Sequence, residues 1–248
     1  MATKPFRILC FGNSLTSGHP VDHPYALMLK TRLEKAFPTL DVQCTINGVP
    51  GDLVTRGTFM DRLGRDWKRA EKPFDWTIVL GGTNDIGWGY PAEEVAQALK
   101  KAWDIPLSRG GKVLALTIPE CRASSATVND RRNSVNKAIK AYKRNNFYAF
   151  DLFDALPYHS MEEADQDKYW GMDGLHLTES GYDLMGSKIA KCLVKIINLE
   201  EAQSTEISSI VTDARQRRMI EDLIFEEERG DPKLLSQGYI VVRKSDLD

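Results

Sequence analysis

The chain has few residues of the kinds that build disulfides or metal sites. Its 248 residues include four cysteines and four histidines, and no two cysteines form a CxxC pair. A disulfide framework or a zinc site needs a closer, paired spacing of such ligands. His19, His23 and His159 also have no carboxylate or cysteine partner at ligand spacing. We therefore expect reduced cysteines, no metal and no other cofactor.

An excess of charge and long apolar runs are missing as well. Lys and Arg total 33 against 35 Asp and Glu, which gives a formal net charge of −2. This balance predicts neither a nucleic-acid nor an acidic-membrane partner. The basic clusters at 131–132 and 215–218 stand among polar or acidic neighbours, so we expect solvated faces there. With no apolar run that could span a bilayer and no apolar leader segment, we expect a cytoplasmic protein without stable membrane insertion.

Apolar runs of strand length alternate with amphipathic segments of helix length along most of the chain. The predicted strands are residues 6–11, 40–46, 76–80, 112–118 and 147–153. The predicted helices are residues 24–37, 55–70, 91–107, 129–144 and 178–199. This alternation predicts an α/β fold with a parallel five-stranded sheet and helices on both faces. In such sheets, functional residues gather in the loops that follow the carboxyl ends of the strands.

The composition changes after about residue 200. Residues 200–230 are rich in charge with apolar positions near helical spacing, and residues 239–242 form a short β-like run. We interpret residues 1–199 as one domain and residues 200–248 as a helical and β appendage. The appendage packs either on the core or on a second subunit, and the second case would make a homodimer through this extension.

Ser14, Asp173 and His176 are the residue types that nucleophilic catalysis requires. A serine hydroxyl attacks only when a base accepts its proton, and the base needs a group that orients it. Asp173 stands three residues before His176, so one short loop can join the two in a hydrogen bond. Ser14 follows the first predicted strand, and only the fold can bring it to that loop. Each residue alone would equally suit a helix cap or a turn.

Three groups in the sequence can stabilise the oxyanion that develops when an ester carbonyl is attacked. Gly51, after the second predicted strand, offers a backbone N–H with little steric cover. Asn84, after the third, offers a side-chain amide, and the N–H of Ser14 lies at a predicted helix N-terminus. All three follow strand ends. Asp85, beside Asn84, either fixes the local turn or binds substrate, and we favour the turn.

Four segments resemble, in order, the conserved blocks of the SGNH hydrolases, also called the GDSL esterase/lipase family. They are residues 12–15 (GNSL), 47–52 (NGVPGD), 81–85 (GGTND) and 173–176 (DGLH). The resemblance covers about residues 6–198 and implies a flavodoxin-like three-layer α/β/α fold with metal-independent ester hydrolysis. It assigns the nucleophile to Ser14, the acid and base to Asp173 and His176, and oxyanion donors to Gly51 and Asn84.

Two positions depart from the family pattern. Asn13 stands where Asp is commoner, and Leu177 follows the histidine where Pro is commoner. Neither change removes a catalytic group, so they bear on the subfamily rather than on activity. Thr16 occupies the last glycine position of a G-x-S-x-G elbow, which disfavours the different fold of the α/β-hydrolases.

The predicted function is that of a serine esterase on small-molecule carboxylic esters of short to medium acyl chain. A carbohydrate O-deacetylase with the same machinery is one alternative. A catalytically silent binding protein whose tail recruits a partner is the other. Trp88, Tyr90 and Trp170 stand near the predicted site and could wall a substrate pocket, or instead seal loops onto the core.

Overall fold

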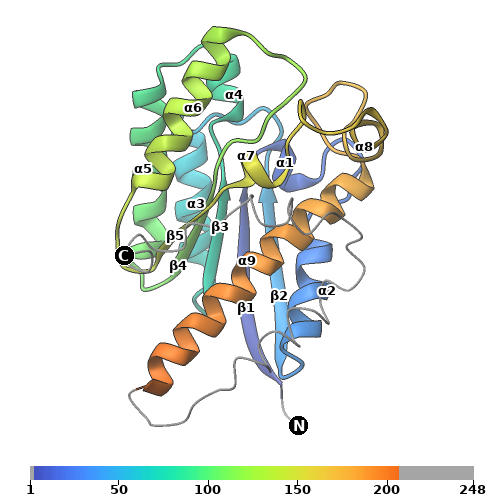
Figure 1. Cartoon of the computed structure of the whole chain (residues 1–248). Coiled ribbons are helices and arrows are strands. Elements are labelled where there is room, and N and C mark those ends of the chain that lie inside the picture. The colour runs from blue at the N-terminus through green and yellow to red at the C-terminus, as the bar shows by residue number, and fades with distance from the viewer. Residues whose placement is uncertain (1–2, 207–248) are drawn as a thin grey trace.

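The protein is built on one parallel five-stranded sheet, and the computed structural model describes residues 3–206 of the chain. The strand order is β2-β1-β3-β4-β5 (Figure 1). The strands are β1 (Lys4–Gly12), β2 (Leu40–Gly48), β3 (Trp76–Leu80), β4 (Lys112–Leu116) and β5 (Phe147–Phe150). This is the flavodoxin-like order, and the predicted α/β class is confirmed.

Helices cover both faces of the sheet. Figure 1 shows α2 and α9 on one face and α3, α5 and α6 on the other. The described helices are α1 (Ser14–Ser17), α2 (Ala26–Ala36), α3 (Gly57–Arg69), α4 (Thr83–Gly87), α5 (Ala92–Leu107), α6 (Ala126–Ala141), α7 (Leu152–Ala155), α8 (Glu163–Tyr169) and α9 (Glu179–Glu206).

The second half of strand β1 is apolar because it packs on both faces of the sheet. Ile8 and Cys10 join the cluster under α2 and α9, whereas Leu9 and Phe11 join the cluster under α3, α5 and α6. All four side chains are fully buried. Burying a large apolar side chain contributes about 1.5–3 kcal/mol. This two-sided packing holds the end of β1 in place. Ser14, a predicted site residue, follows two positions after that end.

The strand order reverses direction at β1, which pairs with β2 on one side and β3 on the other. The loops after β1 and β3 therefore lead to opposite faces and leave a crevice at the carboxyl edge of the sheet. Ser14 opens α1 directly after β1, and Asn84 lies in α4 directly after β3. The topology thus brings these two predicted site residues to the same edge.

Several boundaries differ from the sequence prediction. Helix α9 continues to Glu206, so the predicted division at residue 199 falls inside a helix. Helix α6 begins at Ala126 because the Ser125 side chain caps it by accepting from the Val128 N–H. The tail was predicted to pack on the core or to form a dimer contact. Most of the tail, after Glu206, lies outside the described part of the chain.

Arg132 is a further difference, because it is buried rather than solvated. It is 3% exposed and shares the inward face of α6 with Val135 and Ile139. Its guanidinium donates to Asn129 Oδ1 at 3.2 Å and contacts Cys121 Sγ at 3.3 Å. The second basic cluster, residues 215–218, lies outside the described residues. Among residues 3–206, no helix has the length and apolar character to cross a bilayer.

Candidate active site

Ser14 stands at the first position of α1, in a turn that the end of β1 shapes. Asn13 caps this helix, and its Oδ1 accepts from the Leu15 N–H at 3.2 Å. Gly12 is required before it, since a Cβ there would lie 2.3 Å from the carbonyl oxygen of Leu80. The close contact between β1 and the end of β3 therefore sets the position of Ser14. This residue is 7% exposed.

Asp173 and His176 come from one short loop that is closed by its own hydrogen bonds. Gly171 donates its N–H to the His176 carbonyl at 2.7 Å. Asp173 Oδ1 accepts from the N–H groups of Leu175 and His176, each at 2.9 Å. Its other oxygen, Oδ2, lies 2.6 Å from His176 Nδ1. The carboxylate thus fixes both the loop backbone and the imidazole ring.

The environment of Asp173 keeps its side chain ionised. Partial burial on its own raises the pKa of this carboxyl, but hydrogen bonds from the His176 ring and from the His176 and Leu175 N–H groups lower it to about 2. A charged acceptor favours a proton on Nδ1, which leaves the Nε2 lone pair available as a base.

The fold joins this loop to Ser14. His176 Nε2 lies 2.9 Å from Ser14 Oγ, although the two residues are 162 positions apart. The ring of His19 packs edge-on against the His176 ring, with 5.0 Å between centroids. Ser14, His176 and Asp173 therefore form an unbroken hydrogen-bonded chain, which is the arrangement needed to draw a proton from a serine hydroxyl.

The predicted oxyanion donors lie on the neighbouring loops. Gly51 has a φ of +77°, which favours glycine, and no atom lies within 4 Å of where its Cβ would be. Asn84 donates from Nδ2 to the Asp52 carbonyl at 2.9 Å. That bond ties the Asn84 amide to the segment beside Gly51 and leaves its second N–H for another acceptor.

Asp85 has a larger structural role than the local turn expected for it. Its carboxylate is fully buried and accepts from the Val54 N–H at 3.1 Å and the Thr55 N–H at 3.0 Å. It also accepts from the Thr55 hydroxyl at 2.8 Å. Asp85 therefore fixes the loop that follows Gly51 rather than its own turn. No sequence motif points to this role, because the partners are about thirty positions away.

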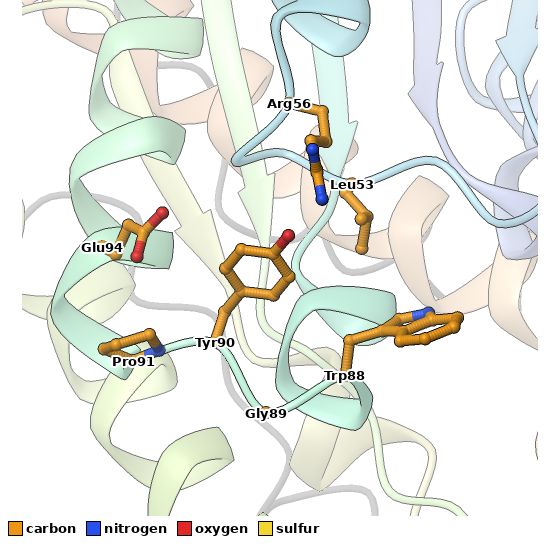
Figure 2. Close-up of a pocket in the computed structure, with 7 residues that line it drawn as sticks. All are labelled: Leu53, Arg56, Trp88, Gly89, Tyr90, Pro91 and Glu94. Atoms are coloured by element: carbon orange, nitrogen blue, oxygen red, sulfur yellow. The ribbon is translucent and has the colours of Figure 1, made fainter.

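An open hollow of about 540 Å³ adjoins the donor side of the site (Figure 2). Its lining residues are Leu53, Arg56, Trp88, Gly89, Tyr90, Pro91 and Glu94. In Figure 2 the Tyr90 ring lies between Arg56 and Glu94, and the Trp88 indole extends away from Tyr90. Trp88 is 77% exposed, so its ring is available to a ligand.

Of the three aromatic residues predicted to line a pocket, Trp88 and Tyr90 line this hollow and Trp170 does not. Trp170 is 4% exposed and packs in the core. Its Nε1 donates to the Pro157 carbonyl at 3.3 Å, and its ring meets that of Tyr158 edge-on. Trp170 seals a loop onto the core, so its predicted place in the pocket is wrong. Leu53, Arg56 and Glu94 were not predicted, since neither apolar nor charged surface positions stand out in a single sequence.

Across residues 3–206, no group of three or more His, Cys, Asp or Glu side chains is arranged to hold a metal ion. The described cysteines are free thiols.

The three-layer fold and the Ser–His–Asp arrangement at its carboxyl edge define a serine ester hydrolase, and comparison with known proteins gives the family. Residues 10–184 match the GDSL-like lipase/acylhydrolase family. The chain belongs to this family. No match is found among curated protein sequences.

Solved structures give the same assignment. A lipolytic protein of the G-D-S-L family from Veillonella parvula is 26% identical, with a TM-score of 0.59 over 74% of this chain and 95% of that one. Two further structures share the fold at low identity. The psychrotrophic esterase EstA from Pseudoalteromonas sp. is 14% identical, with a TM-score of 0.60 over 77% of this chain and 98% of that one. A variant of an acetyl xylan esterase from Geobacillus stearothermophilus is 14% identical, with a TM-score of 0.54 over 76% and 94%.

Proposed function

We propose that the protein hydrolyses carboxylic esters of short to medium acyl chain through an acyl-enzyme, with Ser14, His176 and Asp173 as its triad. The observation that carries this proposal is the continuous chain of contacts from Asp173 Oδ2 to His176 Nδ1, 2.6 Å, and from His176 Nε2 to Ser14 Oγ, 2.9 Å. Unrelated serine hydrolases use the same arrangement, which is recognised by geometry rather than by order in the chain.

The proposed reaction has two halves. His176 Nε2 takes the proton from Ser14 as Oγ bonds to the ester carbonyl carbon, and the imidazolium then gives that proton to the departing alkoxide. Water next attacks the acyl-serine, again losing a proton to His176, which returns it to Ser14 Oγ as the acid leaves. Asp173 holds the ring and stabilises the imidazolium in both halves.

We propose that the N–H groups of Ser14 and Gly51 and the Asn84 side chain stabilise the developing oxyanion by hydrogen bonding. Gly51 supports this because its backbone is exposed and no neighbouring atom covers its Cβ position. Asn84 supports it because its amide is held in place through one N–H only. Each such donor is worth about 2.7–4 kcal/mol of transition-state stabilisation.

A second candidate, a carbohydrate O-deacetylase with the same residues, is favoured by the hollow. Trp88 and Tyr90 offer aromatic faces, while Arg56 and Glu94 offer charged hydrogen-bonding groups beside them. Stacking faces with polar groups at the rim suit a sugar ring better than an alkyl chain. The acetyl xylan esterase that shares the fold acts on such a substrate. The test is release of acetate from acetylated xylo-oligosaccharides by the wild type and by Trp88→Ala. Release by the wild type that the substitution abolishes would favour this candidate over a general esterase.

The test is hydrolysis of p-nitrophenyl esters from acetate to palmitate by the wild type and by Ser14→Ala. We expect turnover of the shorter esters, lowered about 10⁴- to 10⁶-fold by the substitution, because the attacking oxygen is gone. Circular dichroism should show an unchanged fold. Turnover that persists in pure, folded Ser14→Ala would rule out the mechanism. Turnover of neither esters nor acetylated sugars, without labelling by a fluorophosphonate, would indicate a silent binding protein.

A further inference from the structure

The segment NGVPGD contains a carboxylate that the proposed reaction does not use. Asp52 follows Gly51, and its side chain is only 8% exposed. Its Oδ2 accepts from Arg62 of helix α3 through Nη2 at 2.8 Å and Nε at 3.1 Å. Its Oδ1 accepts from the Leu53 N–H at 3.0 Å and the Thr58 hydroxyl at 3.1 Å. Every oxygen of this buried carboxylate is therefore engaged.

The partner, Arg62, also binds two further residues, one at the end of β1 and one near the end of β2. Nη2 also donates to the Gly12 carbonyl at 2.9 Å, and Nη1 donates to the Asn47 carbonyl at 3.1 Å and to Asn47 Oδ1. The guanidinium lies over the Phe11 ring, 4.4 Å from its centroid, and the side chain is 11% exposed. We call these contacts with Gly12, Asn47 and Asp52 the Arg62 junction.

The junction lies next to two of the proposed oxyanion donors and is linked to the third through the Asp52 backbone. Gly12 stands two residues before Ser14, whose N–H is one donor, and Asp52 follows Gly51, whose N–H is another. The Asp52 carbonyl accepts from Asn84, the third. The guanidinium thus joins the end of β1 to the segment around Gly51, and the backbone of Asp52 joins that segment to Asn84 after β3.

Stability alone is a weak explanation for a charged pair at this place. Removing two charges from water costs several kcal/mol for each ion, and apolar residues of similar size often stabilise a core as well or better. Unlike an apolar group, a planar guanidinium holds several N–H donors in fixed directions. Here those directions end at Gly12, at the end of β1, and at Asn47 and Asp52, which lie on either side of Gly51.

We propose that Arg62 is a positioning residue that, with Asp52, sets the spacing of the oxyanion donors. This inference rests on the proposed function, since it assumes that Ser14, Gly51 and Asn84 act on one oxyanion. Lysine cannot replace arginine at this position. Its single ammonium can keep the ion pair with Asp52, but it cannot also reach Gly12 and Asn47 from opposite sides.

The test is a double-mutant cycle on ester hydrolysis that combines Arg62→Lys with Asn84→Ala. We expect Arg62→Lys to lower kcat about tenfold to hundredfold, since small misplacements of catalytic groups cost this much. KM should stay within about twofold, because ground-state binding is not affected. The double variant should lose less than the product of the two single losses, because both changes disturb the same donors.

The matched control is Leu63→Ala, which removes a fully buried side chain next to Arg62 on α3. At a temperature where it stays folded, we expect it to keep the wild-type kcat. Adding it to Asn84→Ala should therefore leave the kcat loss of Asn84→Ala unchanged. A wild-type kcat in Arg62→Lys, or losses of Arg62→Lys and Asn84→Ala that multiply, would overturn the inference.

Two further variants separate the remaining outcomes. If Arg62→Lys does not fold, Asp52→Asn is the second variant. It keeps the side-chain size and removes the charge, and we expect the same fall in kcat and the same non-additivity. A wild-type kcat in folded Asp52→Asn would also overturn the inference. Ser14→Ala separates this failure from failure of the proposed function, because retained turnover there would reject the triad itself.

Discussion

The two sides of the site are held in place by different means. On the donor side, buried side chains join distant segments: Asp85 is fully buried, and the Asp52–Arg62 pair is 8% and 11% exposed. On the acid–base side, the hydrogen bonds of Asp173 span only a few positions. There the Asp173 side chain is 50% exposed.

Because of this difference, substitutions on the two sides should affect turnover and folding stability to different extents. Substituting a buried carboxylate on the donor side leaves several backbone N–H groups without acceptors, and each costs about 1–3 kcal/mol. The acid–base loop loses little stability when Asp173 changes, because water can replace its contacts. We therefore expect substitutions in the loop to affect turnover far more than folding, and those on the donor side to affect both turnover and folding.

The largest effect is expected from Asp173→Asn. An amide cannot hold the His176 ring in the proton state that serves as a base, and the equivalent loss in other triads is about 10⁴-fold in kcat. We expect a fall of about 10³- to 10⁴-fold, with a thermal midpoint close to that of the wild type. Steady-state kinetics and thermal unfolding measure the two quantities.

Asp165→Asn, at an exposed position on α8, is the matched control and should change neither quantity. If Asp173→Asn destabilised the fold strongly, the Asp173 contacts would not be the local, water-replaceable bonds described above.

The next effect is expected from Asn84→Ala, which tests the donor side. The loss of one oxyanion donor should lower kcat about 10²- to 10³-fold and leave KM nearly unchanged. The lost bond to the Asp52 carbonyl should also lower the free energy of unfolding by about 0.5–1.5 kcal/mol. Kinetics and urea denaturation of the same preparation measure both.

Asn84→Asp, which keeps the shape but has no N–H to donate, should lose as much kcat as Asn84→Ala. An unchanged kcat in either variant would remove Asn84 from the oxyanion hole.

The smallest effect is a pH dependence of stability. Despite partial burial, hydrogen bonds within its loop lower the pKa of Asp173 to about 2, below about 3.9 for an unfolded aspartate. The unfolded state then binds the proton more readily. The carboxylate therefore stabilises the fold above about pH 4, and this contribution disappears as the pH falls through about 2.

We expect the difference in unfolding free energy between the wild type and Asp173→Asn to shrink from about pH 5 to about pH 2. Urea denaturation at several pH values measures it. A difference that stays constant over this range would show that the Asp173 hydrogen bonds add nothing to stability.

Much of the fold could be predicted from the sequence because its signals are local. The fully buried run of β3, Trp76–Leu80, has an apolar pattern that needs no partner to be recognised. Helix ends were less certain, since the Ser125 cap of α6 and the continuation of α9 to Glu206 depend on contacts that the pattern does not contain.

The site residues divide in the same way. Ser14, Asp173 and His176 could be named because they belong to short motifs, and the structure brings them within hydrogen-bonding distance. Arg62 could not be named, because it lies on a helix ten positions from Asp52 and no motif joins the two. Trp170 was misplaced for a related reason: a sequence cannot tell whether an aromatic ring near a site faces the cavity or the core.

The most direct test of the central claim is to find which residue a fluorophosphonate modifies. The native protein would be treated with the probe, digested and analysed by peptide mass spectrometry, with Ser14→Ala treated in parallel. We predict one phosphonyl adduct on Ser14, slowed in Asp173→Asn and absent from Ser14→Ala. An adduct on another residue, or none on folded wild type that hydrolyses esters, would contradict the assignment of Ser14 as the nucleophile.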